Sequence, residues 1–383
     1  MRKICVITGT RAEFGLMQSL MHGLKSAHDV ELQVLVTGAH LVPSHGNTYG
    51  EIQSAGFKIH AEVDMVLASD TPRAVGQSIG LGVIGLTKSL AELAPDLVVL
   101  LGDRYEVLAA AQSAMILRIP IAHIHGGEAT EGVIDDAIRH CITKMSHLHF
   151  TSAEPFRRKV IQMGEQPSSV YTVGALGIDN IASLVPLPRE AIEEFLGIRL
   201  DAPVLLVTYH PLTLEADGSA SVDNLLEALA AQDDARIVFT GANADALGQE
   251  INARIRLFCV QRPERAVHVA SMGIQRYLSL MSISEAVIGN SSSGLIEAPF
   301  IGVPTVNIGA RQQGRLRGPS VVDCGDSTDA ILSAIGRARS PELRAIAALR
   351  ETPYGQPGAS SKIVEVLREI NLDGILFKEF YIV

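Results

Sequence analysis

The sequence predicts an α/β protein with two doubly wound parallel sheets that face a central cleft. Three observations lead to this fold class. The chain has 383 residues, more than one ordinary hydrophobic core accommodates, which suggests two domains of roughly 150–200 residues each. Short apolar runs alternate with amphipathic stretches, as is typical of parallel strands buried on both faces and of the helices between them. Residues 182–189, which include Pro186 and Pro188, interrupt this alternation and predict an interdomain linker.

The strands are predicted from apolar runs that are bounded by turn residues. In the first half these runs are Ile4–Thr8, Leu32–Thr37, Leu97–Leu101, Ile121–His125, His147–Thr151 and Tyr171–Val173. In the second half they are Val204–Thr208, Arg236–Thr240, Ala266–Val269, Ala286–Ile288, Thr305–Ile308 and Val321–Cys324. Amphipathic stretches such as Phe14–Leu24 and Tyr105–Leu117 lie between the strands and predict helices.

The linker divides the chain into an N-terminal Rossmann-like domain, residues 1–181, and a C-terminal Rossmann-like domain, residues 190–365. Residues 366–383 form a tail, and its stretch Leu372–Val383 has enough apolar side chains to pack back on the body. In doubly wound sheets, ligands bind outside the carboxyl ends of the strands. The polar residues that follow each strand are therefore the first candidates for a site.

The composition excludes several classes of function. The formal net charge of -10 and the pI near 5.7 argue against nucleic acid as a partner, because a long polyanion needs clustered lysine and arginine. The net charge does not exclude a small phosphorylated ligand. No apolar segment approaches the ~20 residues of a membrane span, and the first strand is too short and too β-branched for a secretory signal. The cysteines form no Cys-x-x-Cys pair, which indicates buried thiols in a reducing cytoplasm rather than a zinc ribbon or disulfides.

The strongest phosphate-binding pattern is the Gly-Asn-Ser-Ser-Ser-Gly sequence Gly289–Gly294, which follows a predicted strand and precedes a helical stretch. Small residues allow the backbone to approach an anion, and serine hydroxyls and helix N-terminal amides can donate to phosphate oxygens. An ordinary serine-capped helix explains the pattern equally well. The pattern is neither a Walker motif nor Gly-x-Gly-x-x-Gly, so neither an NTPase nor a dinucleotide enzyme is indicated.

Two strand ends in the first half carry candidate binding residues. Arg11 lies in the turn after the first strand and could form bidentate hydrogen bonds to a diphosphate. A solvated arginine in a turn is the simpler interpretation. Asp103 and Arg104 follow the apolar run Leu97–Leu101. Asp103 is either a helix cap or, with Arg104, part of a site for a sugar and its phosphate.

The densest group of acidic and basic side chains surrounds Gly126 and Gly127. It comprises His123, His125, Glu128, Glu131, Asp135, Asp136, Arg139 and His140. A zinc site is disfavoured, because His123 and His125 alternate along a predicted strand and so point to opposite faces. General acid–base catalysis fits these groups better. Asp135 and Asp136 also precede a helical pattern, so at least one of them is expected to be only an N-cap.

Two strand ends in the second half also carry candidate residues. His210 stands where a predicted strand ends before Pro211, so its imidazole is expected to point into the crevice. Arg311 begins the basic loop 311–317, which either neutralises a diphosphate or is a solvated or interface loop.

In combination and in this order, the motifs resemble the hydrolysing UDP-N-acetylglucosamine 2-epimerases of the sialic-acid pathway, the NeuC type. The matching segments are Thr10–Glu13, Leu101–Arg104, His123–Glu128, Ile134–Asp136, Arg139–His140, Ile142–His149, Gly289–Gly294 with Glu297, and Arg311–Gln312 with Gly314–Arg315. The resemblance covers nearly the whole chain. It implies a two-domain GT-B-like fold, a UDP-binding C-terminal domain, and no metal or redox cofactor.

The resemblance also implies a reaction and the residues that perform it. UDP leaves UDP-N-acetylglucosamine by anti elimination to a glycal, and hydration with inversion at C2 gives N-acetylmannosamine for sialic-acid-type sugars. The catalytic roles fall on Asp103, Asp135 and His210, while His125, Glu128 or both replace a further family carboxylate. Contacts to the UDP-sugar fall on Arg11, Ser291, Ser292 and the ribose-binding Glu297, on Asn243 and Tyr277 near the uridine, on His40 and Asn47 near the sugar, and on the strand-end residues Arg104 and Arg311.

Three alternatives stay open. Relatives in the legionaminic-acid pathway use UDP-N,N'-diacetylbacillosamine, whose sugar carries an extra acetamido group and lacks a hydroxyl. A glycosyltransferase of the same fold would bind a UDP-sugar but would need an acceptor. A non-catalytic nucleotide-sugar sensor is disfavoured by the density of acid–base groups. The resemblance further implies a homodimer or tetramer.

Overall fold

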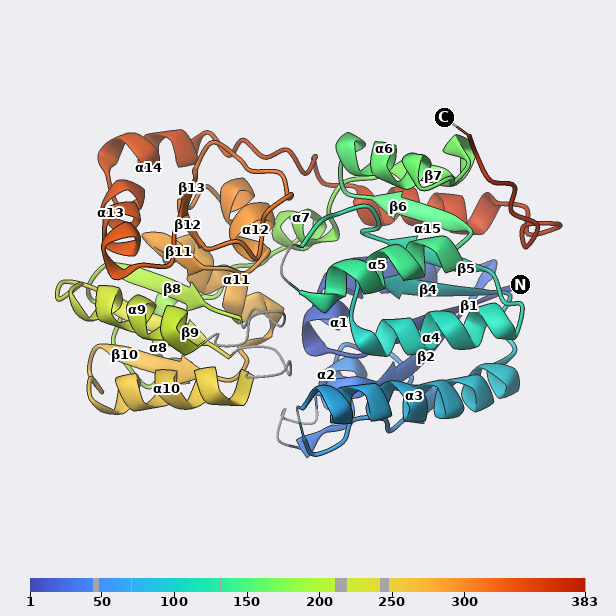
Figure 1. Ribbon diagram of the computed structural model, residues 1–383, viewed down its shortest axis with the longest axis horizontal. Helices are drawn as coiled ribbons and strands as arrows, with labels where there is room; N and C mark the ends of the chain where they lie inside the picture. The colour runs from blue at the N-terminus through green and yellow to red at the C-terminus, as the bar shows by residue number, and fades with distance from the viewer. Residues whose placement is uncertain (44–47, 70, 131–132, 211–218, 242–247, 383) are drawn as a thin grey trace. The chain divides into compact units, whose positions relative to one another are not determined.

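The computed structural model describes residues 1–43, 48–69, 71–130, 133–210, 219–241 and 248–382. The chain divides into two compact units, and Figure 1 labels most of their helices and strands. Unit 1 comprises Met1–Glu128, Ile134–Asn180 and Tyr354–Val383, and unit 2 comprises Ala129–Val133 and Ile181–Pro353. The chain passes into unit 2 beside the predicted linker 182–189. At the other boundary the structure differs from the expected one, because residues 354–365 lie in unit 1.

Unit 1 contains a seven-stranded parallel sheet in the order β3-β2-β1-β4-β5-β6-β7. Its strands are β1 (Arg2–Thr8), β2 (Val30–Thr37), β3 (Ala61–Val63), β4 (Leu97–Leu101), β5 (Ile121–Ile124), β6 (Leu148–Thr151) and β7 (Val170–Thr172). Its helices are α1 (Arg11–Ser26), α2 (Tyr49–Ser54), α3 (Pro72–Leu93), α4 (Tyr105–Ile116), α5 (Ile134–Met145), α6 (Glu154–Gln162), most of α7 (Leu176–Ala182), and α15 (Ala359–Glu369). The sheet is buried on both faces, as its apolar strands predict.

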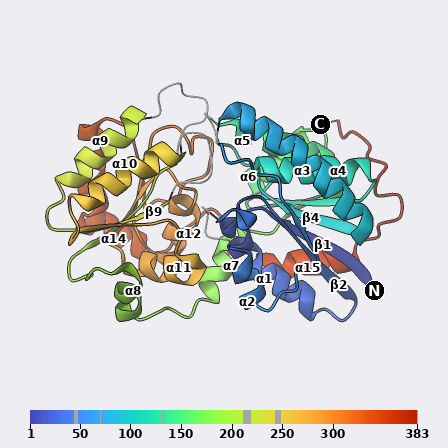
Figure 2. The same ribbon diagram turned by 90° about the horizontal axis from the view of Figure 1, so that it is seen from below.

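The two faces of the unit 1 sheet are covered by different helices. One core contains apolar side chains of α1 and α15, and the other contains those of α3, α4 and α5. Figure 2 shows the resulting three layers, with β1 and β4 between α1 and α15 below and α3 and α4 above. Helix α15 belongs here because Ala359, Ile363 and Leu367 recur every four residues and are fully buried in the core shared with α1.

Unit 2 contains a six-stranded parallel sheet in the order β10-β9-β8-β11-β12-β13. Its strands are β8 (Val204–Thr208), β9 (Arg236–Thr240), β10 (Ala266–Val269), β11 (Ala286–Gly289), β12 (Thr305–Ile308) and β13 (Val321–Cys324). Its helices are α8 (Arg189–Leu196), α9 (Ser219–Ala230), α10 (Gly248–Val260), α11 (Gly273–Ile283), α12 (Ser293–Ile301), α13 (Thr328–Ala338) and α14 (Pro341–Ala348). Apolar side chains of α9, α10 and α13 cover one face, and those of α8, α11 and α12 cover the other.

The structure confirms the predicted fold class of two doubly wound parallel sheets. Two local expectations differ from it. Strand β3 was not predicted, because its three residues form no apolar run and pair only with the end of β2. His125 was expected in a strand, but β5 ends at Ile124 and His125 adopts a left-handed φ of 67°. Within the described residues, no helix is long and apolar enough to cross a bilayer.

Candidate functional site

Each sheet has one position where the strand order reverses direction, and several of the predicted site residues follow the strands on either side of it. In unit 1 the reversal lies between β1 and β4, so the turn that contains Arg11 lies beside the turn that contains Asp103 and Arg104. In unit 2 it lies between β8 and β11, so His210 lies beside the loop that begins at Asn290. Crevices at such switch points are where doubly wound folds bind ligands.

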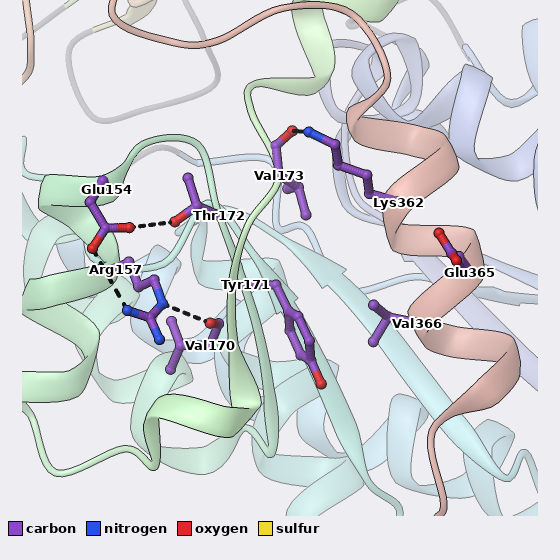
Figure 3. A pocket seen from close by; sticks show the side chains of 9 residues that line it. All are labelled: Glu154, Arg157, Val170, Tyr171, Thr172, Val173, Lys362, Glu365 and Val366. Atoms are coloured by element: carbon purple, nitrogen blue, oxygen red, sulfur yellow. Dashed lines mark hydrogen bonds and ion pairs between the residues drawn. The ribbon is translucent and has the colours of Figure 1, made fainter.

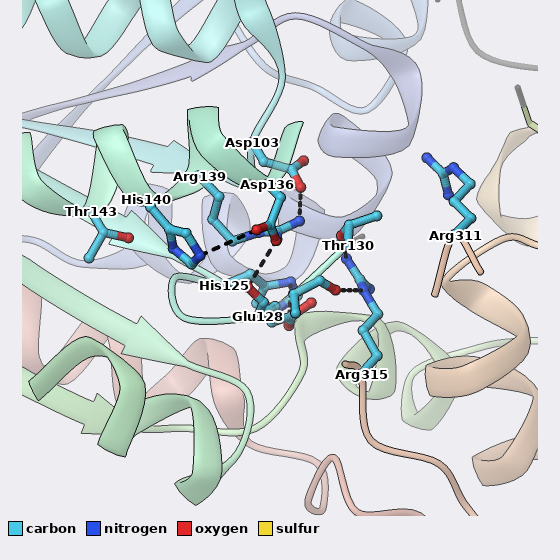
Figure 4. Close-up of polar contacts among 12 residues, drawn as sticks. Asp103, His125, Glu128, Thr130, Asp136, Arg139, His140, Thr143, Arg311 and Arg315 are labelled. Atoms are coloured by element: carbon cyan, nitrogen blue, oxygen red, sulfur yellow. Dashed lines mark hydrogen bonds and ion pairs between the residues drawn. The ribbon is translucent and has the colours of Figure 1, made fainter. Parts of the chain in front are cut away.

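Arg139 is the centre of the acidic cluster in unit 1 (Figure 4). This guanidinium is 1% exposed and forms an ion pair with Asp103, which stands at the end of β4. It also donates to Asp136 Oδ1 at 3.1 Å and to the carbonyl oxygen of Glu128 at 3.0 Å. Asp136 Oδ2 lies 3.5 Å from His140 Nε2. One buried cation therefore holds two carboxylates at the predicted acid–base site.

The sequence left open which of Asp135 and Asp136 caps a helix. Both lie within the first turn of α5, which begins at Ile134, and neither is the residue that precedes the helix. Carboxylates in this turn are stabilised by the helix dipole. Asp136 is the one that pairs with Arg139, and Asp135 is half-buried beside it. The catalytic role predicted for Asp135 stays a prediction.

His125 and Glu128 lie together in the loop after β5. The His125 amide continues the strand ladder by donating to the carbonyl of Phe150 at 2.8 Å. Its Nδ1 lies 3.8 Å from Glu128 Oε1, which also accepts a hydrogen bond of 2.6 Å from Ser152 Oγ. His125 is 9% exposed and Glu128 is 1% exposed. Both side chains are thus shielded from water, which suits general acid–base chemistry.

His123 has a structural role instead. It is fully buried, with Nε2 at 2.7 Å from the carbonyl of Gly102 and Nδ1 at 3.2 Å from Thr143 Oγ1. Burial lowers the pKa of His123 to about 3, so the ring is neutral at physiological pH. The ring thereby supports the turn that carries Asp103. No group of His, Cys, Asp or Glu within the described residues could hold a metal ion.

The turn after β1 is filled by a carboxylate of the protein itself. Glu13 Oε2 accepts hydrogen bonds from the amides of Gly9 at 2.8 Å and Thr10 at 3.3 Å, which completes a capping box with the Thr10 hydroxyl. Those amides are therefore engaged by Glu13. Arg11, from the same turn, extends to Glu51 at 2.6 Å, and both of these side chains are partly exposed.

His40 and Arg104 are both buried near this turn. His40 is fully buried, with Nε2 at 3.0 Å from Thr8 Oγ1 and Nδ1 at 2.7 Å from Thr48 Oγ1. Burial lowers its pKa to about 4, so both ring nitrogens serve a neutral internal bridge. Arg104 is 8% exposed and donates to both carboxylate oxygens of the fully buried Glu106, at 3.3 and 3.4 Å.

The serine loop of unit 2 differs from the turn after β1. Ser292 precedes α12 without a side-chain capping bond, and Ser291 Oγ lies 3.2 Å from Ser293 Oγ. Among the residues that the structure describes, the amides of Ser291 and Ser292 have no protein acceptor. Amides at a helix N-terminus that are not engaged by the protein suit an anion. The phosphate-binding role of Ser291 and Ser292 stays a prediction.

The other predicted residues of unit 2 surround this loop. Tyr277 Oη lies 2.5 Å from Ser293 Oγ, and burial together with the nearby charge of Glu297 raises the pKa of Tyr277 to about 12. Glu297 lies on α12 and is 7% exposed. Arg311 Nη1 donates to the carbonyl of Asn290 at 3.1 Å. The predictions for Asn47 and Asn243 lie outside the described residues.

Sequence reasoning did not assign roles to several residues that organise these groups. Asn290 contacts the backbone of His210, Gln312 contacts Asn290, and Ser152 contacts Glu128. Arg139 was recognised only as one member of a charged cluster. In the sequence, only the position of these residues after strands pointed to a role. Their roles follow from contacts with residues that are distant in the sequence.

A separate surface cavity of about 480 Å³ lies beside the edge strand β7, next to α6 and α15 (Figure 3). Three of its charged side chains form hydrogen bonds: Glu154 accepts from Thr172 at 3.0 Å, and Arg157 donates to the carbonyl of Val170 at 2.9 Å. Lys362 donates to the carbonyl of Val173 at 3.4 Å. Because β7 is at the edge of the sheet, this cavity is distant in strand order from the β1–β4 switch point.

Comparisons with known proteins place the chain in a family. The model of the family described as UDP-N-acetylglucosamine 2-epimerase matches residues 22–368. The chain is 39% identical, over 99% of its length and 98% of the other, to the Campylobacter jejuni protein named GDP/UDP-N,N'-diacetylbacillosamine 2-epimerase (hydrolyzing). It is 35% identical to polysialic acid biosynthesis protein P7 of Escherichia coli, over 100% of this chain and 97% of that one. It is 33% identical to the UDP-N,N'-diacetylbacillosamine 2-epimerase (hydrolyzing) of Legionella pneumophila, over 97% of each chain.

Solved structures share the fold. The Neisseria meningitidis UDP-GlcNAc 2-epimerase bound to UDP-GlcNAc matches with a TM-score of 0.82 and 20% identity, over 95% of this chain and 99% of that one. The Staphylococcus aureus MnaA structure with UDP matches with a TM-score of 0.80 and 18% identity, over 96% of each chain. Because the family model covers most of the sequence and relatives above 30% identity span nearly all of it, the chain belongs to the UDP-N-acetylglucosamine 2-epimerase family.

Proposed function

We propose that this chain is a hydrolysing 2-epimerase of nucleotide-activated amino sugars and that its substrate is UDP-N,N'-diacetylbacillosamine. The observation that carries the choice of sugar is the identity of 39% to the C. jejuni relative, whose name states that sugar, over 99% of the chain. The L. pneumophila relative carries the same sugar in its name. This reverses the order of the sequence analysis, which placed UDP-N-acetylglucosamine first and this sugar second.

The acid–base groups of unit 1 support the chemistry. In the proposed elimination, a base removes the proton from C2, the C–H electron pair becomes the C1–C2 double bond, and UDP leaves with the electrons of the C1–O bond. Water then adds a hydroxyl group at C1, and a proton returns to C2 from the opposite face. Asp103, Asp135 and the His125–Glu128 pair are proposed to move these protons, and His210 is proposed to act with them.

The leaving group is proposed to be held by serine and arginine donors. A departing diphosphate gains negative charge, which hydrogen-bond donors and cations stabilise in the transition state. Ser291 and Ser292 are suited to this because their amides have no protein acceptor among the described residues. Arg11 and Arg311 are proposed to contribute positive charge, and Glu297 is proposed to accept from the ribose.

UDP-N-acetylglucosamine is the second candidate substrate. The description of the matched family names it, and the E. coli relative at 35% identity is named for polysialic acid biosynthesis. The two sugars share the C2 acetamido group and the nucleotide, so the same eliminating groups would serve either one.

The test is proton NMR of the purified protein in deuterated water without added metal or acceptor. Separate tubes receive UDP-N,N'-diacetylbacillosamine, its GDP counterpart and UDP-N-acetylglucosamine. We expect free UDP and a C2-deuterated manno-configured diacetamido sugar in the first tube, formed faster than any product in the others. Faster turnover of UDP-N-acetylglucosamine would replace the proposed sugar with the second candidate. No nucleotide release in any tube would reject the hydrolysing epimerase and direct the search to a glycosyltransferase acceptor.

A further inference from the structure

We infer that Asn290 is the positioning residue for His210, so that its side-chain amide aligns the imidazole for turnover. This inference rests on the proposed function, in which His210 acts on the substrate. It assigns Asn290 a role separate from that of the serine hydroxyls and amides that follow it in the same loop.

The Asn290 amide holds the His210 backbone from both sides. The amide of His210 donates to Asn290 Oδ1 at 2.7 Å, and Asn290 Nδ2 donates to the carbonyl of His210 at 2.8 Å. Asn290 is 1% exposed and His210 is 6% exposed, so water does not compete strongly for these bonds. The backbone N–H and C=O groups of His210 are therefore both hydrogen-bonded to the side chain of Asn290.

This arrangement extends the sheet by one step beyond its strands. Strands β8 and β11 pair in parallel up to Thr208 and Gly289, and the Asn290 amide then donates to the carbonyl of Thr208 at 3.1 Å. Gly289 has φ of 135°, and a Cβ atom there would lie 1.9 Å from the carbonyl oxygen of Thr208. The backbone of β11 thus turns away from β8 at Gly289. Beyond this point the Asn290 side chain, in place of the backbone, forms the hydrogen bonds to His210.

The third neighbouring strand supports Asn290 itself. Gln312, which follows β12 and is fully buried, donates from Nε2 to the carbonyl of Asn290 at 2.7 Å. Arg311 Nη1 donates to the same oxygen at 3.1 Å. The ends of β8, β11 and β12 are adjacent in the sheet, and Asn290 joins all three. A shift of the Asn290 side chain would therefore also shift the backbone of His210.

Two variants separate the proposed bonds. Asn290→Ala removes both contacts to His210. Asn290→Asp has nearly the same shape and can still accept from the His210 amide, but it cannot donate to the His210 carbonyl. We expect each variant to lower kcat by about 10–100-fold, the scale of a small misplacement of a reacting group. Binding of UDP, measured by calorimetry, is expected to change less than kcat in Asn290→Ala, because the serine loop keeps its own donors.

Asn307→Ala is the matched control. Asn307 lies on β12 of the same sheet, is equally buried at 1% exposure, and uses its amide to bind Asp323 at 2.6 Å rather than His210. We expect it to lower the thermal midpoint as much as Asn290→Ala does, with kcat close to that of the unmodified protein. Equal losses of kcat in the two asparagine variants would show a general effect of destabilisation and overturn the inference.

The double variant His210→Ala with Asn290→Ala gives the decisive readout. If Asn290 acts through His210, its removal has no further effect once the imidazole is absent, so the losses are not additive. Additive losses, or unchanged kcat in both Asn290 variants, would reject the positioning role. Unmodified turnover in His210→Ala alone would instead reject the role of His210 in the proposed function, and the two failures are thereby distinguished.

Discussion

Asp103 and Asp136 bind the same guanidinium, that of Arg139, yet only Asp103 stands at the end of a strand at the switch point. We therefore predict that Asp103 is the reacting carboxylate and that Asp136 only balances the charge of Arg139. We expect Asp103→Asn to lower turnover by at least ~100-fold, the scale of a lost acid–base group. Asp136→Asn removes a carboxylate from the same cation and serves as the matched variant.

If Asp103 acts only by balancing the charge of Arg139, both variants should lose activity to the same extent. We expect Asp103→Asn to be at least ~10-fold slower than Asp136→Asn in initial-rate measurements at saturating substrate. Equal rates for the two would contradict a direct role for Asp103.

Glu13 gives the stability of unit 1 a dependence on pH. Burial, and then the negative charge of Glu106, raise the pKa of the Glu13 carboxyl from 4.5 to about 7, against the opposing effect of Arg104 and the amides of Gly9 and Thr10. The folded protein therefore holds this proton more tightly than the unfolded chain does. Its contribution to stability is full below the unfolded pKa and is lost as pH rises through the folded one.

Glu13→Gln removes the ionisation and keeps an acceptor for the Gly9 amide. We expect the variant to become more stable relative to the unmodified protein as the pH rises from about 5 to about 8. The change in the difference between their thermal midpoints should correspond to roughly 1–3 kcal/mol of unfolding free energy. Glu62→Gln, an exposed substitution on β3, is the control and should show no such trend. A pH-independent difference for Glu13→Gln would mean that Glu13 is ionised throughout.

At the scale of elements, Lys378 links the C-terminal tail to the body of unit 1. Lys378 Nζ binds Glu165 Oε2 at 2.7 Å and the carbonyls of Lys144 at 2.9 Å and Ser146 at 2.5 Å. Glu165 is 1% exposed and also binds His149 at 3.0 Å. Burial alone would raise the pKa of Glu165, but hydrogen bonds from His149, Lys144 and Lys378 together lower it to about 2. The carboxylate is thus charged and available to the tail throughout the neutral range.

We expect Lys378→Ala to release the tail from the body of unit 1. The amide of Tyr381 donates to the carbonyl of Gly164 at 2.9 Å, and its hydrogen exchange should become roughly ten-fold faster, because the loss of hydrogen bonds from a charged group costs about 1–3 kcal/mol. Glu379→Ala changes the neighbouring side chain and should leave that exchange rate unchanged. Identical rates in Lys378→Ala would show that the apolar residues of the tail hold it without the lysine.

At the scale of the whole molecule, the last part of the chain completes the hydrophobic core of unit 1. Helix α15 buries Ile363 and Leu367 against α1, and Arg2 of β1 donates to the carbonyl of Ile370 at 2.7 Å. The first and last segments of the sequence therefore share one core. A change in α15 should affect unit 1 and not unit 2.

Leu367→Ala tests this division. We expect a loss of about 2–5 kcal/mol in the stability of unit 1, because a fully buried leucine leaves a cavity when truncated. Hydrogen exchange should accelerate in β1 and α1 and stay unchanged in β8 and β11. Leu349→Ala, at a side chain that is 67% exposed, is the control with little expected effect. Equal acceleration in both units would contradict two separate cores.

Prediction from sequence succeeded where a property is local. The run Leu97–Leu101 was expected as a strand and is β4 with the same bounds, because five consecutive apolar residues before a turn suit a strand buried on both faces. His125 was misplaced, because its left-handed conformation follows from the loop it begins rather than from its own preference. Strand β3 was missed because pairing with β2 creates it.

The candidate site shows the same limit. The sequence by itself determined the fold class, the family motifs and the strand ends that carry Asp103, His210 and the serine loop, because periodicity and turn chemistry act over a few neighbouring residues. Only the tertiary structure decided that Arg139 binds Asp103, that Asn290 holds His210, and that α15 completes unit 1. These contacts join residues that are distant in the chain, and their stability comes from burial that exists only once the sheets have formed.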